Sequence, residues 1–187
     1  MSMKYLGEQI DIHTGGEDHL SIHHPNEIAQ SEGATGKKPF SKFWIHSAFL
    51  TVDGTKMSKS LGNYFTIEDI IAKGYNPIAL RYLYLGAHYK KPMNFTWQAL
   101  DGALKGLKRL QQTVNNLQIS ARTILSEEKN QKMEDYRIKF NLAINDDLNT
   151  SKAMAVMFEM LKSNIPNPDK YDLAIFFDEV LGLRLKV

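Results

Sequence analysis

The chain has 187 residues, of which 43% are hydrophobic and 10% aromatic, so it can bury the core of one or two domains. Its formal net charge of +2 is too small to mark a nucleic-acid-binding protein, and the lack of cysteine excludes disulfides, thiol nucleophiles and thiolate metal ligands within this chain. No apolar run approaches about 18 residues and no secretory signal opens the sequence, so we expect a cytoplasmic protein with no membrane partner.

The first 65 residues alternate short strand-like and helical segments. Residues 9–12 are strand-like, residues 25–31 have a helical pattern that begins near proline and stops before Gly33, and residues 43–52 are rich in β-branched and aromatic side chains. A strand, turn, helix, strand order is typical of an α/β layer. We therefore expect part of a parallel sheet in this region.

Two helices follow, and both have clear start signals. Thr66 and Asp69 have the spacing of a capping box for a helix that Gly74 ends. Asn76 and Pro77 then cap and open the next helix.

From Thr96 onward the sequence predicts helices that pack together. Apolar residues recur every three or four positions in a long first helix and in two C-terminal helices, and a further helix is expected over residues 133–143. The three apolar stripes are Leu100, Leu104, Leu107, Leu110, Val114 and Leu117; Ala153, Val156, Met157, Met160 and Leu161; and Leu173, Phe176, Phe177, Val180 and Leu181. Such stripes indicate an antiparallel helical bundle with short loops.

The decapeptide GTKMSKSLGN, residues 54–63, places two lysines and several hydroxyl groups in a loop bracketed by glycine. Lys56 and Lys59 carry compact charges on flexible stems, so they can bind a polyphosphate and follow its charge during a reaction. A solvated basic turn is the alternative. Because little of the loop is expected to be buried, we also expect residues 53–63 to be mobile or poorly ordered without ATP.

A second candidate site lies in the sequence DIHTGGEDHLSIHHPNEIAQSE, residues 11–32. Gly16 permits close backbone approach, and Asp18 is a short carboxylate suited to accepting hydrogen bonds from sugar hydroxyls. His23 and Glu27 are four residues apart, which on a helix brings an imidazole and a carboxylate within reach of one zinc ion.

Each of these features also has an ordinary explanation when it is taken alone. A glycine pair followed by aspartate occurs in many turns, and a histidine four residues before a glutamate often makes only a surface hydrogen bond. The other histidines of the segment, His13, His19 and His24, are equally compatible with a structural role.

Together, the two strings resemble the cysteinyl-tRNA synthetases, a class I aminoacyl-tRNA synthetase family whose signature loop is KMSKS. The likeness extends over residues 63–100 and 145–161. It implies an α/β region followed by an all-α region: the C-terminal part of a Rossmann-like catalytic domain, a stem-contact region and an antiparallel bundle. The domain boundaries that we expect are 1–65, 66–95 and 96–187.

The resemblance implies a cysteine–tRNA ligase that forms cysteinyl-adenylate from ATP, with Mg, and cysteine, and then esterifies the 3′ end of tRNA(Cys). Zinc would bind the thiolate of cysteine and so select cysteine over serine, because soft sulfur outcompetes a hydroxyl. Carried over, the family's functional residues fall on Gly16, Asp18 and Lys59 for ATP, on Lys56 and Lys59 for catalysis, and on His23 and Glu27 for zinc.

Two departures from the family pattern lead us to expect an inactive fragment. The family's other two zinc ligands are cysteines, which this sequence lacks, and no HIGH-type motif is present. We therefore expect zinc to bind weakly or not at all to this chain. We also expect a monomer whose bundle lies along tRNA, with a basic face that either contacts phosphates or is merely solvated; this face is Lys105, Lys108 and Arg109.

Two alternatives remain open at this point. The ligase that joins cysteine to an amino sugar in mycothiol synthesis shares the zinc site and the KMSKS loop but needs no tRNA. A fragment that binds tRNA or acts as a scaffold without catalysis is a second alternative. The joint presence of Asp18, His23 and Glu27 favours a chain derived from a catalyst.

Overall fold

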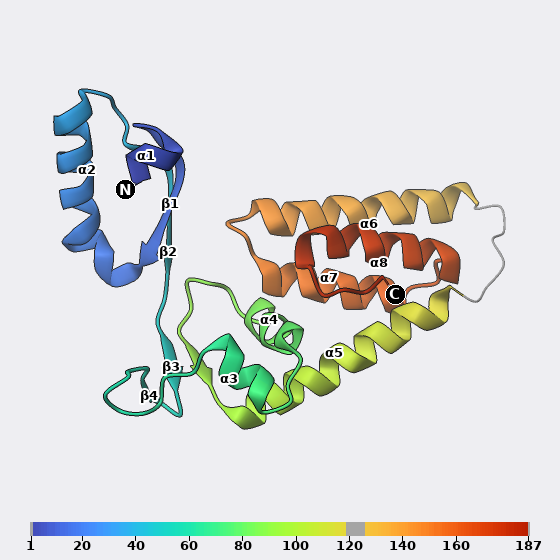
Figure 1. Cartoon of the computed structure of the whole chain (residues 1–187). Helices are drawn as coiled ribbons and strands as arrows, with labels where there is room; N and C mark the ends of the chain where they lie inside the picture. The colour runs from blue at the N-terminus through green and yellow to red at the C-terminus, as the bar shows by residue number, and fades with distance from the viewer. Residues whose placement is uncertain (1, 119–125, 187) are drawn as a thin grey trace. The chain divides into compact units, whose positions relative to one another are not determined.

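The structure, a computed structural model, describes residues 2–118 and 126–186. The chain divides into two compact units, which we call the α/β unit, Met1–Thr51 with Tyr89–Met93, and the helical unit, Val52–His88 with Asn94–Val187. The expected order of an α/β region followed by helices is confirmed (Figure 1). Among the described helices, none is both long and apolar enough to cross a membrane. The boundaries expected at 65/66 and 95/96 stay predictions.

A parallel strand pair forms the centre of the α/β unit. Its elements are α1 (Ser2–Leu6), β1 (Ile10–Gly16), the 3₁₀ helix η1 (Glu17–Ser21), α2 (His23–Thr35) and β2 (Ser41–Ser47). β1 and β2 are parallel, with Ile10 opposite Ser41 and Gly16 opposite Ser47. A parallel connection needs a crossover, which α2 provides. The parallel arrangement expected from the sequence is therefore present.

The helix α2 is longer than the sequence pattern indicated. It runs through Gly33 and ends at Gly36, whose φ of 71° is left-handed and whose N–H donates to the carbonyl of Glu32. Glycine adopts this conformation without steric cost, so it is the effective stop. Gly33, at which we expected the helix to end, is accommodated inside it.

A small second sheet begins after β2. The strands are β3 (Leu50–Val52), β4 (Thr55–Lys56) and β5 (Met93–Phe95), in the order β4-β3-β5. Asp53 and Gly54 connect β3 to β4 with φ values of 48° and 77°. Positive φ at both positions is what a two-residue type I′ hairpin requires. The single strand expected over residues 43–52 is therefore two strands, β2 and β3.

Six helices make up most of the helical unit in the described residues: α3 (Ile67–Ala72), α4 (Pro77–Leu85), α5 (Trp97–Leu117), α6 (Glu127–Asn145), α7 (Thr150–Lys162) and α8 (Asn167–Leu181). The start signals read from the sequence are present. Thr66 and Asp69 form the capping box of α3, and the side chain of Asn76 accepts a hydrogen bond from the N–H of Ile78 at the start of α4.

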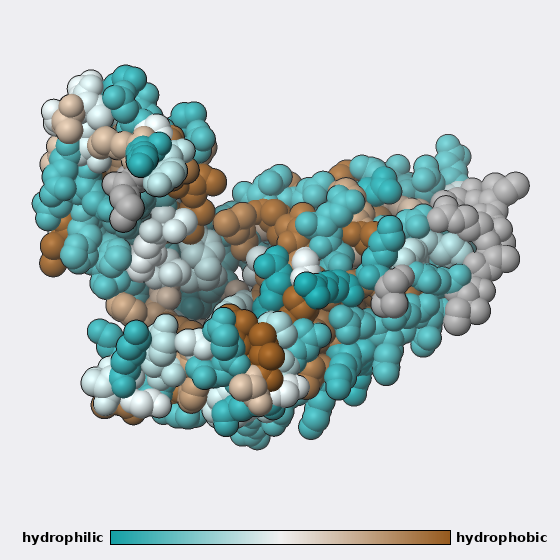
Figure 2. Space-filling view, viewed as in Figure 1, coloured by the Kyte–Doolittle hydropathy of each residue, from teal (hydrophilic) through white to brown (hydrophobic). Residues whose placement is uncertain are grey.

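The core of the helical unit is built from the expected stripes. Leu100, Leu107 and Leu110 of α5 are buried, and Phe140 of α6 stacks on Phe177 of α8 with ring centroids 4.1 Å apart. The viewed face of the unit is mainly hydrophilic, with separate apolar patches (Figure 2). One stripe residue departs from expectation, because Val180 is 48% exposed.

The segment after α8 folds back and completes this core. Asp178 accepts hydrogen bonds from the backbone N–H groups of Leu183, at 2.6 Å, and Leu185, at 2.8 Å. Both leucine side chains are fully buried. Arg81 of α4 donates to the carbonyl of Val180, which ties the end of α8 to α4. Leu183 and Leu185 thus continue the core beyond the last helix.

Candidate metal and nucleotide site

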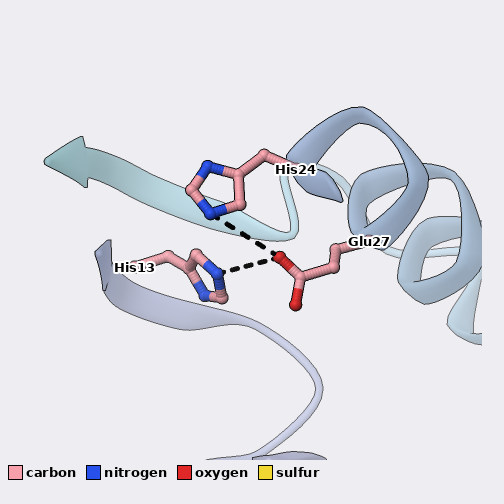
Figure 3. Close-up of side chains that lie close together, drawn as sticks. All are labelled: His13, His24 and Glu27. Atoms are coloured by element: carbon pink, nitrogen blue, oxygen red, sulfur yellow. Dashed lines mark ion pairs between the residues drawn. The ribbon is translucent and has the colours of Figure 1, made fainter. Parts of the chain in front are cut away.

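Two histidines converge on one carboxylate in the α/β unit. The Nε2 atom of His13, from β1, lies 3.0 Å from Oε2 of Glu27, and Nε2 of His24 lies 3.8 Å from the same oxygen. His24 and Glu27 both come from α2 (Figure 3). One potential ligand atom from each of the three residues lies within 4.8 Å of the others. We call His13, His24 and Glu27 the histidine–carboxylate cluster.

Packing against aromatic rings places His24 inside this cluster. The residue is 4% exposed, and its ring lies 4.7 Å from the ring of Trp44 and 4.9 Å from that of His13. Gly15 makes the approach possible, because a Cβ at that position would lie 2.6 Å from the His24 ring. No L side chain fits there without a shift, so the glycine is required by the buried imidazole.

A fourth histidine orients the buried one. Nδ1 of His24 lies 2.7 Å from Nε2 of His46, which comes from β2. When His24 carries its proton on Nδ1 and donates it to His46, the lone pair of its Nε2 is on the side of Glu27. Such a hydrogen bond fixes the ring and tautomer of a metal-binding histidine.

The electrostatic surroundings keep His24 neutral. Burial lowers its pKa below the ordinary value for histidine, and the nearby imidazoles of His13 and His46 lower it further, against a smaller opposing effect of Glu27. Metal binding requires a deprotonated imidazole nitrogen, which this environment supplies at neutral pH.

The donor set fits a divalent metal such as zinc. Two imidazoles and a carboxylate are the ligand types of catalytic zinc sites, which have three protein ligands and leave the fourth position for water or substrate. The cluster opens into a cavity of about 400 Å³, lined by His13, Thr14, His19, His23, His24 and Glu27. Two features make the cluster suited to a metal ion: His24 is neutral and oriented, and both histidines point to one carboxylate oxygen of Glu27.

Of the residues predicted for zinc and adenosine, His23 and Glu27 line this cavity. His23 is exposed and lines it, with its ring 4.9 Å from that of His19, but the three-residue cluster contains His24 in its place. Its role as a ligand stays a prediction, as do the adenosine roles of Gly16 and Asp18. Gly16 precedes η1, and a Cβ there would collide with the carboxylate of Asp18. The glycine therefore lets that carboxylate fold back against the backbone.

Sequence reasoning did not single out His46, and it weighed His13 and His24 as structural residues or as extra donors that a bound metal would have to recruit. The alternation of side chains between the two faces of a strand could have indicated His46. Trp44 and His46 are two residues apart, so they share one face of β2. In the parallel register Trp44 pairs with His13, and the rings of His13, Trp44 and His46 each lie against the ring of His24.

Lys56 and Lys59 belong to the helical unit. Lys56 ends β4, Lys59 lies in the loop that follows, and both side chains are exposed. The ammonium of Lys59 lies 5.3 Å from the centroid of the Tyr64 ring. The segment has several internal hydrogen bonds, so it is better defined than its composition indicated; its mobility without ATP stays a prediction.

Comparison with known proteins identifies the family. The model of the tRNA synthetases class I (C) catalytic domain matches residues 1–105, more than half of the chain. The chain belongs to this synthetase family. A DALR domain model also matches residues 139–164, in α6 and α7.

Curated relatives of this family cover nearly all of the chain. A cysteine–tRNA ligase of Caldicellulosiruptor saccharolyticus is 47% identical over 87% of the chain, and one of Treponema denticola is 41% identical over 99%. The chain spans 36% and 41% of the lengths of these relatives.

A solved structure shares the fold of this synthetase segment. It is the ternary complex of LeuRS from Agrobacterium radiobacter K84 with tRNA and LeuAMS, and the TM-score is 0.68. The match covers 92% of this chain and 26% of that one, at 14% sequence identity. At this identity the likeness concerns the fold alone.

Proposed function

We propose that this chain is part of a cysteine–tRNA ligase, which activates cysteine with ATP and transfers it to tRNA(Cys). The observation that carries the proposal is the 41% identity over 99% of the chain to a cysteine–tRNA ligase. The histidine–carboxylate cluster supports it, because the chemistry of cysteine selection calls for a metal site. No feature of the chain favours the amino-sugar ligase over the tRNA ligase.

The cluster is proposed to hold one zinc ion through Glu27 and histidines of the same cavity. When bound, zinc supplies a Lewis acid that prefers the sulfur of cysteine to the hydroxyl of serine. Glu27 and His13 provide donor atoms, and His46 holds the buried His24 in the neutral, ligand-competent tautomer. The resemblance adds His23, which lines the same cavity.

The nucleotide is proposed to use two further parts of the chain. Asp18, whose carboxylate lies against Gly16, accepts hydrogen bonds from ribose hydroxyls. Lys56 and Lys59 bind the triphosphate of ATP, with Mg, and stabilise the charge that moves to pyrophosphate as the adenylate forms. The exposed basic face of α5 is the proposed contact with tRNA phosphates.

A chimaera tests the proposal directly. This chain replaces the matching segment of the Treponema denticola relative, and cysteine-dependent ATP–pyrophosphate exchange and charging of tRNA(Cys) are measured. We expect activity with cysteine and none with serine. Lys59→Ala is expected to lower the exchange rate by about 10²–10³ with a smaller change in cysteine affinity, because the lysine acts on charge that develops in the transition state.

Lys91→Ala is the matched control, because Lys91 is also an exposed lysine in a connecting segment. It is expected to leave both activities unchanged. A folded chimaera that activates cysteine but charges an amino sugar in place of tRNA would overturn the tRNA assignment. Equal activation of serine would overturn the cysteine assignment.

A further inference from the structure

The side chain of Asn63 closes the lysine loop. Its Oδ1 accepts a hydrogen bond from the N–H of Ser58 at 2.8 Å. Its Nδ2 donates to Oγ1 of Thr55 at 3.0 Å and to the carbonyl oxygen of Lys56 at 3.1 Å. One amide group therefore connects the end of the loop to three points on its opposite arm.

Further hydrogen bonds anchor this arrangement to the sheet. Thr55, which accepts from Asn63, donates in turn to the carbonyl oxygen of Val52 at 2.9 Å, and Val52 is a buried residue of β3. Within the loop, the hydroxyl groups of Ser58 and Ser60 lie 2.7 Å apart. Thr55 and Ser60 are exposed, and Ser58 and Asn63 are only half-buried, so hydrogen bonds rather than apolar burial define the loop.

Asparagine suits position 63 better than side chains of similar size do. It offers an acceptor and two donors on one short, uncharged group. Aspartate would keep the acceptor for Ser58 but lose both donors. It would also place a negative charge beside Lys56 and Lys59, where it would compete with a bound anion.

The residue that follows Asn63 holds the second lysine. The ammonium of Lys59 lies 5.3 Å from the centroid of the Tyr64 ring, which is within the range of a cation–π interaction. At an exposed position this interaction is weak, so a polyphosphate can displace it. Asn63 and Tyr64 thus act on the two lysines in different ways, one on the backbone and one on an ammonium group.

We propose that Asn63 is the positioning residue of the lysine loop: it fixes the backbone from Lys56 to Lys59 so that both ammonium groups face one triphosphate. Tyr64 keeps Lys59 ordered until the phosphate arrives. The inference rests on the proposed function only in taking the ligand of the loop to be the triphosphate of ATP.

Amide hydrogen exchange of the 187-residue chain, followed by NMR, tests the hydrogen bonds without any activity. We expect the Ser58 amide to exchange about tenfold faster in Asn63→Ala, because its acceptor is lost. In Asn63→Asp the acceptor remains, so the Ser58 amide should stay protected. Asn130→Ala, on the exposed surface of α6, is the matched control and should exchange like the unaltered chain.

Titration with inorganic tripolyphosphate at constant ionic strength, also followed by NMR, tests the positioning role. We expect Lys59→Ala to weaken binding most and Asn63→Ala to weaken it about threefold to tenfold, because the lysines are no longer held together. Asn63→Asp should weaken binding more than Asn63→Ala, owing to its added charge. Asn130→Ala should leave binding unchanged.

The outcomes separate this inference from the proposed function. Equal Ser58 exchange in Asn63→Ala and the unaltered chain overturns the inference. If Lys59→Ala weakens tripolyphosphate binding and Asn63→Ala does not, the phosphate role of the loop stands and the positioning role falls. If neither variant changes binding, the phosphate role itself is wrong, and the inference falls with it.

Discussion

Glu27 is the residue at which the two independent indications of a metal site agree. The family resemblance pairs it with His23, and the structure brings His13 and His24 to its carboxylate. Both sets need the same acidic ligand but different imidazoles. The choice between them can therefore be measured residue by residue.

We expect this chain to bind zinc, but less tightly than a site with thiolate ligands, because nitrogen and oxygen donors contribute less than thiolates. Glu27→Gln should weaken binding most. His13→Ala and His24→Ala should each weaken it more than His23→Ala, because only the first two direct a ring nitrogen at Glu27. Isothermal titration with zinc at neutral pH gives the affinities.

His88→Ala is a control outside the cavity, since His88 belongs to the helical unit. A larger loss in His23→Ala than in His13→Ala and His24→Ala would favour the ligand pair of the family. No measurable binding in the unaltered chain would support the original expectation that two ligands are too few.

For single residues, the sequence indicated the type of metal site better than it indicated which histidines form it. Spacing along a helix was enough to suggest that Glu27 works with a histidine. Which histidine is buried depends on Trp44 across the strand pair and on the space left at Gly15. Both are tertiary effects, which the local spacing of His23 and His24 does not contain.

Among the helices and strands, α3 is stabilised by a capping box that contains a titratable carboxyl group, that of Asp69. The N–H and hydroxyl of Thr66 donate to Asp69, and these hydrogen bonds lower the pKa of that carboxyl below its usual range. A lowered pKa in the folded state means that the ionised group stabilises the helix above the ordinary carboxyl pKa. This stabilisation is lost as the pH falls through the lowered value.

We therefore expect the protection of the α3 amides, measured as their exchange rate relative to the intrinsic rate at each pH, to decrease in acid, with a midpoint below the ordinary pKa of aspartate. Asp69→Asn should remove this dependence, whereas Glu68→Gln, which leaves the cap intact, should retain it. A carboxyl carbon titration of Asp69 by NMR gives the same pKa independently. Titration at the ordinary value for aspartate would contradict the role of the hydrogen bonds.

The segment after α8 depends on one acidic side chain. Asp178→Ala removes the acceptor for the N–H groups of Leu183 and Leu185, whose side chains are buried. We expect a loss of about 2–3 kcal/mol in unfolding free energy, as for hydrogen bonds to a charged group. Thermal unfolding should shift by roughly 4–12 °C.

Glu179→Ala is the matched control for Asp178→Ala, because Glu179 is the adjacent, exposed acid. It should change the unfolding temperature little. Equal shifts in the two variants would mean that lost charge, rather than the fold-back of the chain, accounts for the effect.

Helix starts and apolar stripes were predictable because they depend on neighbours within one turn of helix. The capping box of Thr66 and the stripe of α5 needed no tertiary information. Spacing alone did not predict burial at Val180. Its position fits an apolar stripe, but the segment that folds back after α8 covers the core instead, and Val180 is exposed. The division between β2 and β3 likewise depends on which strands each one pairs with.

At the scale of the whole molecule, the two units differ greatly in buried apolar material. Among the described residues, the buried hydrophobic side chains of the α/β unit are Ile10 and Phe40, and all others belong to the helical unit. A two-stranded pair is marginal without more core. We therefore expect the α/β unit to unfold at a lower denaturant concentration than the helical unit.

The tryptophans provide one reporter for each unit, Trp44 in the α/β unit and Trp97 in the helical unit. In urea, fluorescence of the Trp97→Phe variant should change before that of the Trp44→Phe variant. Zinc should raise only the first transition, because its proposed site lies in the α/β unit. Coincident transitions for the two reporters would contradict independent stability of the units.

The strand pair β1–β2 also bears on how the chain behaves at high concentration. Neither strand has a further strand beside it within the described ranges, and Ile12 and Phe43, which are paired in register, are 57% and 65% exposed. Open strand edges with apolar side chains pair readily with other chains. Purified protein should therefore be lost mainly through intermolecular β-sheet formation, and its usable lifetime in solution should depend more on concentration than on the stability of its helices.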